Sequence, residues 1–181
     1  MKMLKKLLAV VLTGAMVLTL LTACGGNAVN DKNIADALND IVKSSVAAGL
    51  TKDYTFKPRT DEQAMAKAIA ALSEAEWNTK GDGGNKFSGP VMKILGLNEG
   101  GKNETSRFVW CGAVIADEIG VTGQAYNVMN NILSKDAVNA DKLEGEPADI
   151  RYIGTALDTL TIYGKQTTVR IIVVTAPVEK K

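Results

Sequence analysis

The sequence of 181 residues contains no histidine, and this absence removes several classes of chemistry. Without an imidazole there is no serine–histidine–aspartate triad, no cysteine–histidine dyad and no histidine base that titrates near neutral pH. Histidine-ligated zinc and haem sites are excluded for the same reason. This absence excludes these reaction classes, and for the chain as a whole we expect no catalytic residue, no resident metal and no cofactor.

Aromatic residues and net charge are also scarce. Only 5% of the residues are aromatic, and the chain carries 21 basic against 20 acidic side chains. A surface that binds nucleic acid needs clustered positive charge, and binding of single strands also needs aromatic side chains on which the bases stack. The composition therefore predicts that nucleic acid is not a partner.

The beginning of the chain is typical of an exported protein. Three lysines, Lys2, Lys5 and Lys6, precede an apolar stretch over residues 7–21. This stretch is shorter than the roughly 20 apolar residues that span a bilayer, and a basic start before such a stretch is typical of a secretory signal peptide.

The end of this segment is more specific. Leu21-Thr22-Ala23-Cys24 resembles the bacterial lipobox, in which an apolar residue and two small residues precede a cysteine. The resemblance implies cleavage after Ala23 and diacylglycerol on the Cys24 thiol. We expect a signal peptide over residues 1–23, a tether over 24–30 and a single domain over 31–181. The lipid bilayer is then a partner through acylated Cys24, on the extracytoplasmic face of a bacterial membrane. The alternative is a short uncleaved anchor with an incidental cysteine.

The second cysteine, Cys111, lies in the apolar stretch Arg107-Phe-Val-Trp-Cys-Gly-Ala-Val-Ile-Ala116. Activation of a thiol requires a basic or cationic neighbour, and the chain has no histidine to serve. Apolar neighbours are instead typical of a buried cysteine that acts as a small hydrophobic residue. We expect Cys111 and Trp110 to lie in the core.

Apolar residues at helical spacing predict helices in the first two thirds of the chain. The first helix ends at Gly49, and its apolar residues are Ile34, Leu38, Ile41, Val42 and Val46. The second opens with the capping box Thr60-Asp-Glu-Gln63, and its stripe comprises Ala64, Met65, Ala68, Ile69 and Leu72. A short helix follows near residues 91–95. In the helix after Thr122, one face carries Ala125, Val128, Met129, Ile132 and Leu133, with Gln124, Asn127 and Asn131 directed away.

The last third is rich in β-branched residues, which predicts strands over residues 150–157, 159–163 and 167–175, with a turn at 164–166. Residues 169–174 are apolar on both alternating faces except at Arg170, so this strand is expected to be central and covered on both sides. Residues 54–58 are expected to be an extended link. The pattern predicts an α/β (α+β) domain, an α-β-α sandwich in which helices flank an antiparallel sheet.

The order of these elements resembles the CAP superfamily of cysteine-rich secretory proteins, antigen 5 and plant pathogenesis-related proteins, whose bacterial members are called SCP-like. The resemblance covers residues 34–175. Gly112-Ala113-Val114-Ile115-Ala116 keeps the frame of the family motif Gly-Glu-Asn-Ile-Ala, and Tyr152-Ile153-Gly154 is similar to its Ile-Gly strand start.

In the CAP family, two histidines and two acidic residues line a cavity that can hold a divalent metal. The resemblance places the first histidine near Trp77 or Asn78, the motif glutamate at Ala113 and the second histidine near Asp136 or Ala137. None of these positions retains the family residue, so the resemblance implies a degenerate CAP-like cavity at Asn78, Ala113 and Asp136 without a metal.

The sequence thus favours a membrane-anchored extracytoplasmic lipoprotein with a non-catalytic binding or structural domain, whose ligand is a cell-envelope polymer or a protein. Two alternatives stay open. One is a hydrolase of cell-envelope polymers that uses carboxylates alone, for example Glu118 and Asp136. The other is a solute-binding lipoprotein or a different α+β fold.

Overall fold

A computed structural model describes residues 31–77, 89–97, 105–117, 119–133, 138–139 and 143–180. The predicted signal peptide, Cys24 and the tether lie outside these residues, as do Asn78 and Asp136. The described part contains helices and strands in this order: α2 (Asp31–Ala47), β1 (Thr55–Pro58), α3 (Thr60–Ala70), α4 (Glu74–Trp77), α5 (Gly89–Ile94), β2 (Arg107–Ile115), α6 (Val121–Leu133), β3 (Gly145–Pro147), β4 (Ile150–Ile162) and β5 (Lys165–Lys180).

The main sheet has the strand order β1-β4-β5-β2, and β3 pairs with the end of β5. The predicted mixture of helices and sheet, with helices flanking the sheet, is confirmed. The prediction of a purely antiparallel sheet is wrong, because the expected link at residues 54–58 contains β1, which pairs in parallel with β4. Pro58 ends this edge strand, a position where the missing N–H of proline is tolerated.

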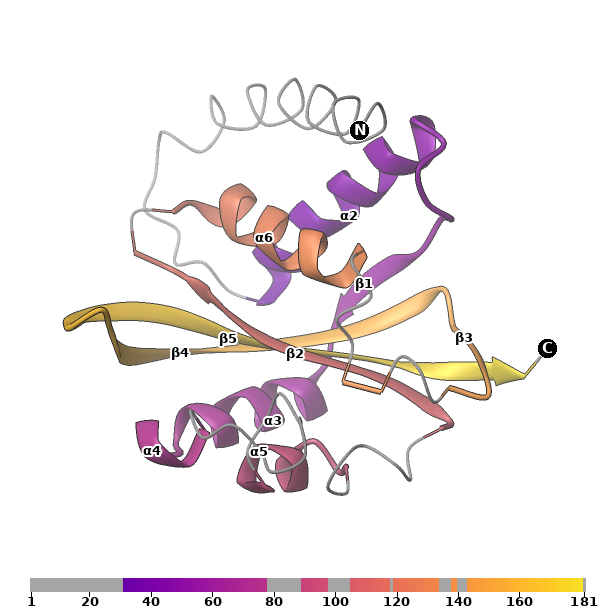
Figure 1. Cartoon of the computed structure of the whole chain (residues 1–181). Helices are drawn as coiled ribbons and strands as arrows, with labels where there is room; N and C mark the ends of the chain where they lie inside the picture. Colours follow the sequence, from indigo (N-terminus) through magenta and orange to yellow (C-terminus); the bar gives the residue numbers. More distant parts are fainter. Residues whose placement is uncertain are drawn as a thin grey trace.

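Helices cover both faces of the sheet (Figure 1). The α2 and α6 helices lie on one face, and α3, α4 and α5 lie on the other. Alternate side chains of β5 enter the two cores. Ile172 and Val174 pack in the cluster that includes α2 and α6, whereas Ile171 and Val173 pack in the cluster that includes α3 and α5. The prediction of a central strand covered on both sides is confirmed.

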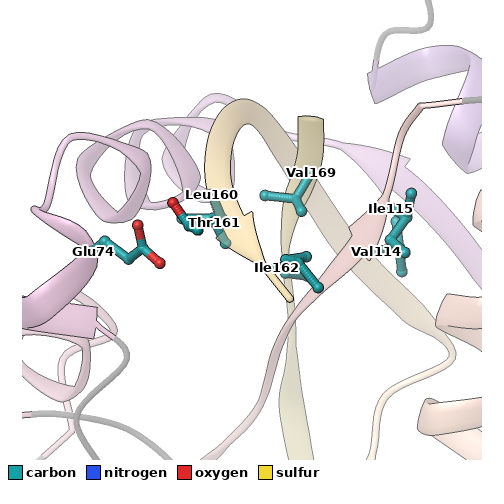
Figure 2. Close-up of a pocket in the computed structure, with 8 residues that line it drawn as sticks. Glu74, Val114, Ile115, Leu160, Thr161, Ile162 and Val169 are labelled. Carbon is teal, nitrogen blue, oxygen red and sulfur yellow. The ribbon is translucent and has the colours of Figure 1, made fainter. Parts of the chain in front are cut away.

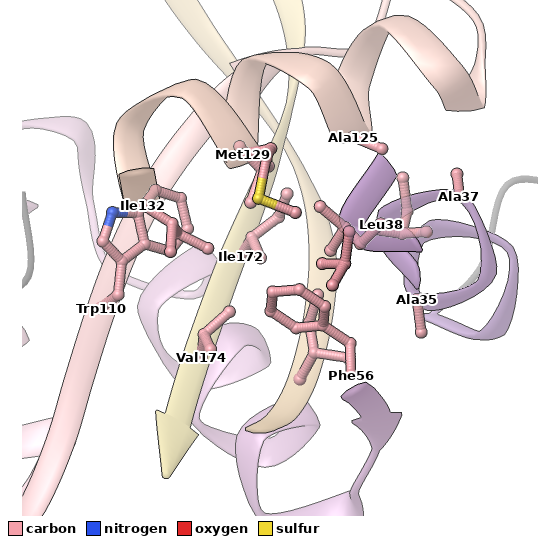
Figure 3. Packing of buried hydrophobic residues seen from close by; sticks show 14 of the residues in the cluster. Ala35, Ala37, Leu38, Phe56, Trp110, Ala125, Met129, Ile132, Ile172 and Val174 are labelled. Carbon is pink, nitrogen blue, oxygen red and sulfur yellow. The ribbon is translucent and has the colours of Figure 1, made fainter. Parts of the chain in front are cut away.

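Figure 3 shows the core between the sheet and the helices α2 and α6. As predicted, α2 buries Ile34, Leu38 and Val42, and Gly49 follows the helix with a φ of +68°. This left-handed conformation is the usual helix ending that glycine provides. Trp110 and the predicted aliphatic face of α6 complete the core, except that Leu133 is partly exposed.

The buried face of α3 differs from the predicted stripe. Ala64 and Ala68 are exposed, whereas Glu62 and Ala66 are fully buried. The helix begins at Thr60 as expected, but no capping box forms, since the N-cap residue is Arg59 and makes no capping hydrogen bond with its side chain.

Two contacts with distant strands explain this rotation of α3. Glu62 pairs with Arg59 and accepts a 2.6 Å hydrogen bond from the Thr175 hydroxyl of β5. Gly154 of β4 lies directly beneath the helix, where a Cβ atom would stand only 1.9 Å from the backbone nitrogen of Gln63. The helix therefore rests on the sheet at a glycine and directs Glu62 inward.

The β4–β5 hairpin is longer than expected, because the two strands predicted over residues 150–163 form one continuous strand. The turn at Tyr163 and Gly164 has positive φ at both residues, +50° and +76°. Two residues with positive φ form the type I′ turn, whose twist matches that of a hairpin.

A chain of hydrogen bonds compensates the one charge in the central part of β5. Arg170 is 5% exposed, and its guanidinium donates to the side-chain oxygens of Gln124 and Thr155, both at 2.9 Å. The Thr155 hydroxyl in turn donates to Asp31 at 2.6 Å. Gln124 is therefore buried, contrary to the prediction that it points away, because it is a partner of Arg170.

This chain of hydrogen bonds predicts the effect of a mutation on stability. Thr155→Val removes the hydroxyl between Arg170 and Asp31 and leaves buried polar groups without that partner, which should lower the free energy of unfolding by about 2–3 kcal/mol. Thr159→Val, on the same face of β4 but exposed, is the control. Chemical denaturation measures the free energy of unfolding of both variants. Equal denaturation midpoints would contradict the structural role of these hydrogen bonds.

Candidate functional site

A cavity of about 250 Å³ lies at the end of the sheet formed by the β4–β5 hairpin (Figure 2). It is lined by residues of α4, β2, β4 and β5, namely Glu74, Ala113, Val114, Ile115, Leu160, Thr161, Ile162 and Val169. Ala113 pairs with Ile171, which packs in the core of α3 and α5. Because side chains alternate along a strand, Ala113, Ile115 and Val169 face that same side of the sheet.

The cavity exists because α3 stops before the hairpin does. α3 ends at Ala70, whereas β4 continues to Ile162. On the face of the sheet beyond α3, Ile115 is 42% exposed and Ile162 is partly exposed, whereas Leu160 and Val169 are buried. α4 supplies the opposite wall through Glu74.

The lining is aliphatic with one charged end. Figure 2 shows Glu74 and Thr161 at one end of the cavity, and Val114 and Ile115 at the other. Among the described lining residues, Glu74 is the one ionisable group. The arrangement suits a ligand with an apolar body and a cationic or hydrogen-bond-donating end.

Of the three positions predicted for a degenerate cavity, the structure describes Ala113 alone. Ala113 is exposed on β2 and lines the cavity. Asn78 and Asp136 lie outside the described residues, and so does the lipid-attachment residue Cys24. Trp77, the alternative to Asn78, ends α4, the same short helix that begins with Glu74.

Glu74 and the hydrophobic wall formed by Leu160, Ile162 and Val169 were not predicted from the sequence. The alternation of β4 and β5 does place these three side chains on one face. The end of α3 determines which part of that face has no helix over it. The sequence pattern does not predict where α3 ends.

The described residues give little support for hydrolytic chemistry. They contain no group of three or more acidic or cysteine side chains that could hold a metal. Asp117, at the end of β2, accepts a 2.6 Å hydrogen bond from the backbone nitrogen of Thr168, and this bond lowers the pKa of Asp117. The Asp117 side chain is thus engaged in a structural hydrogen bond between the end of β2 and β5. Glu118 lies outside the described side chains.

Glu62 is a buried carboxylate with a structural role. Burial alone would raise the pKa of Glu62, but hydrogen bonds from Arg59 and Thr175 outweigh burial and hold its pKa below the usual value. The Arg59 guanidinium also stacks 3.9 Å from the centre of the Tyr152 ring. These contacts fix α3 on the sheet and leave Glu62 unsuited to exchange protons near neutral pH.

A second, more open depression of about 330 Å³ lies at the start of α3. Its charged groups are engaged in contacts within the protein. Arg59 pairs with Glu62, Lys32 with Asp36, and Asp31 accepts hydrogen bonds from Thr155 and Gln63. It is therefore a weaker candidate than the cavity at Ala113.

Comparison with known proteins finds no family model, no curated protein and no solved structure that matches this chain. Within the described residues, no helix is long and apolar enough to cross a membrane. The function is therefore argued from the cavity and its chemistry.

Cys111 is buried among apolar side chains, as predicted, and burial raises the pKa of its thiol to about 12. A thiol with this pKa is only about one part in 10⁵ thiolate at pH 7, and the thiolate is the reactive form. In a Cys24→Ser protein, in which Cys111 is the one remaining thiol, we expect no reaction with a thiol reagent until denaturant is added. Rapid labelling of the folded protein at pH 7 would contradict this.

Proposed function

We propose that the chain is a lipid-anchored extracytoplasmic binding module whose cavity at Ala113 receives a small group with an apolar body and a cationic end. The observation that carries the proposal is the lining of the cavity, aliphatic along its length with the Glu74 carboxylate at one end. An apolar cavity with few convergent polar groups is the usual form of a binding site.

The size of the cavity limits its ligand. Its volume of about 250 Å³ is below the roughly 300–1,000 Å³ of pockets for drug-sized molecules. A short alkyl chain or a single side chain of a larger ligand fits this space. A polymer would therefore bind by inserting one substituent.

Binding is favoured over hydrolysis by the number of ionisable groups. A glycosidase uses two carboxylates that face each other across the scissile bond. The described lining of the cavity supplies only Glu74. The alternative of a hydrolase that uses carboxylates alone therefore gains no support from this cavity.

The architecture supports the related proposal of a divergent CAP-like domain. The structure has the element order helix, strand, helix, then strand, helix and hairpin. The resemblance to the CAP family rests on this order. A single main sheet with helices on both faces also argues against a two-lobed solute-binding protein. The loss of the family's acidic residue at Ala113 accords with an apolar cavity.

The proposed anchor keeps this domain near the membrane. Six residues separate Cys24 from Asp31, the first described residue of α2. Even a fully extended chain of this length holds Asp31 within about 25 Å of the acylated cysteine.

The anchor predicts the behaviour of a cysteine variant. Cys24→Ala should abolish metabolic labelling with a fatty-acid analogue and release the protein from the membrane fraction, because the acyl chains supply the membrane affinity. Cys111→Ala is the matched control and should keep full labelling. Persistent labelling of the Cys24→Ala protein would rule out the proposed attachment site.

The cavity predicts binding of the n-hexylammonium ion, measured by calorimetry or NMR titration with a dissociation constant in the millimolar range. Ala113→Phe fills the cavity and should weaken binding about tenfold or more. Thr159→Phe, exposed on the other face of the hairpin, is the control. Glu74→Gln should weaken binding by about two- to fivefold, as expected for one exposed ion pair.

A hexylammonium affinity that is equal in the wild-type and Ala113→Phe proteins would contradict the proposed site. Glu179→Gln, which removes an exposed carboxylate far from the cavity, controls for the change in net charge. If Glu179→Gln weakens binding as much as Glu74→Gln does, the assigned role of Glu74 is wrong.

A further inference from the structure

The turn of the β4–β5 hairpin carries a residue that its backbone conformation disfavours. Tyr163 has a φ of +50°, whereas type I′ turns favour asparagine, aspartate or glycine at this position, and a bulky residue there is strained. The Tyr163 side chain is fully exposed, so no packing within the domain offsets this strain. Backbone strain of this kind clusters at functional sites. The turn therefore points to a contact outside the domain.

The composition of the hairpin end suits a layer of lipid headgroups. Residues 159–168 carry one charged side chain, Lys165, and it follows the turn. Ile162 precedes Tyr163 and is partly exposed. Tyrosine is enriched at membrane–water interfaces, where its ring lies at the level of the headgroups. Lysine near such a surface is attracted to anionic lipids.

The described chain begins beside the base of this hairpin. The Asp31 carboxylate accepts hydrogen bonds from the backbone nitrogen of Thr155 at 3.0 Å and from its hydroxyl at 2.6 Å. The tether proposed for residues 24–30 therefore joins the domain next to β4. From Thr155, β4 continues over eight further residues to Tyr163, a length of about 27 Å. Figure 1 shows the turn beyond the ends of α2 and α6.

These two lengths match. The proposed tether holds Asp31 within about 25 Å of the acylated Cys24, and the hairpin reaches about 27 Å from Thr155. A domain that directs its turn towards the bilayer is therefore not lifted clear of the headgroups by its tether. Tethering also raises the effective concentration of the turn at the membrane surface, so that even a weak contact can orient the domain.

We propose that residues 162–165 form a second membrane contact, in which the Tyr163 ring lies among the lipid headgroups and Lys165 approaches their phosphates. This inference rests on the proposed lipid anchor and adds an orientation to it. The cavity, whose wall includes Leu160 and Ile162, then opens close to the membrane surface. Its ligand is therefore a group that reaches the headgroup layer.

A second copy of the chain fits the turn less well. A stable interface buries about 800 Å² on each partner, far more than a four-residue stretch at a hairpin turn can offer. Two turns that met about a two-fold axis would also bring two Lys165 side chains together, and like charges at such a contact repel. A lipid surface has neither of these difficulties.

The test measures how deeply the turn lies in the bilayer. The acylated protein is reconstituted into vesicles of phosphatidylcholine and phosphatidylglycerol, with or without a lipid that carries a nitroxide on its headgroup. An environment-sensitive fluorophore is attached to a cysteine introduced by Gln166→Cys, which lies near the turn. Cys24 is blocked by its lipid and Cys111 is buried, so the introduced thiol is the reactive one.

Two matched positions carry the same fluorophore. Ala68→Cys lies on the exposed side of α3, and Glu179→Cys lies at the far end of β5. We expect the nitroxide lipid to quench the fluorophore at residue 166 about threefold or more as strongly as at either control position, as for a segment within the headgroup layer.

Substitutions of Tyr163 separate a membrane contact from a structural role. Tyr163→Asn places a residue that accepts positive φ in the turn, so the midpoint of chemical denaturation should stay the same or rise. The same variant should lose most of the quenching at residue 166. Tyr163→Trp, which keeps an interfacial aromatic ring, should retain the quenching.

The other outcomes overturn defined parts of the account. If the protein does not sediment with the vesicles, the proposed anchor fails and this inference fails with it. If the protein sediments but all three positions are quenched equally, the hairpin contact is wrong and the anchor stands. Full quenching in Tyr163→Asn would remove the role of Tyr163. Shielding of residue 166 from aqueous iodide without quenching by the lipid, increasing with protein density, would assign the turn to a second copy.

Discussion

The fold depends on the burial of β5 on both of its faces. Residues Ile171 to Val174 are each 1% exposed or less, and their side chains alternate between two separate cores. A strand of this kind requires a layer of helices on each side, which α2 and α6 provide on one face and α3 and α5 on the other. Arg170 is tolerated beside this stretch because Thr155 and Gln124 accept its hydrogen bonds.

The central position of β5 also relates the hairpin to the cavity. β5 pairs with β2 on one side and with β4 on the other, and its pairing with β4 continues to the turn at residues 163–164. The paired strands extend past the end of α3, so the sheet carries aliphatic side chains beyond its helical cover. The region in which a ligand can bind is thus a consequence of the mismatch in length between α3 and the hairpin.

Features that depend on local pattern could be predicted from the sequence. These include the apolar face of α2, the ending at Gly49, the central position of β5 and the burial of Cys111. What could not be predicted depends on partners far along the chain. Glu62 turns inward because of Thr175, which is 113 residues away, and Gln124 turns inward because of Arg170, which is 46 residues away.

The parallel pairing of β1 and the position of Glu74 also depend on residues far along the chain, and they could not be predicted for the same reason. The short segment Thr55–Pro58 has no pattern that distinguishes a link from an edge strand, and only its pairing with β4 decides. Ala113 was proposed as a cavity position only from the resemblance to the CAP family, and the structure places it on β2, where it lines the cavity. Glu74 lies on a four-residue helix whose position relative to the sheet no periodicity specifies.

The most direct test of the account is to locate the bound group by NMR, with methyl-labelled isoleucine, leucine and valine in the mature protein and hexylammonium as the probe. The account predicts saturable shift changes at Ile115, Leu160, Ile162 and Val169, with no change at Leu157, which is exposed on the other face of β4. Shift changes spread over the surface, or none at these four residues, would contradict a binding cavity at the end of the sheet.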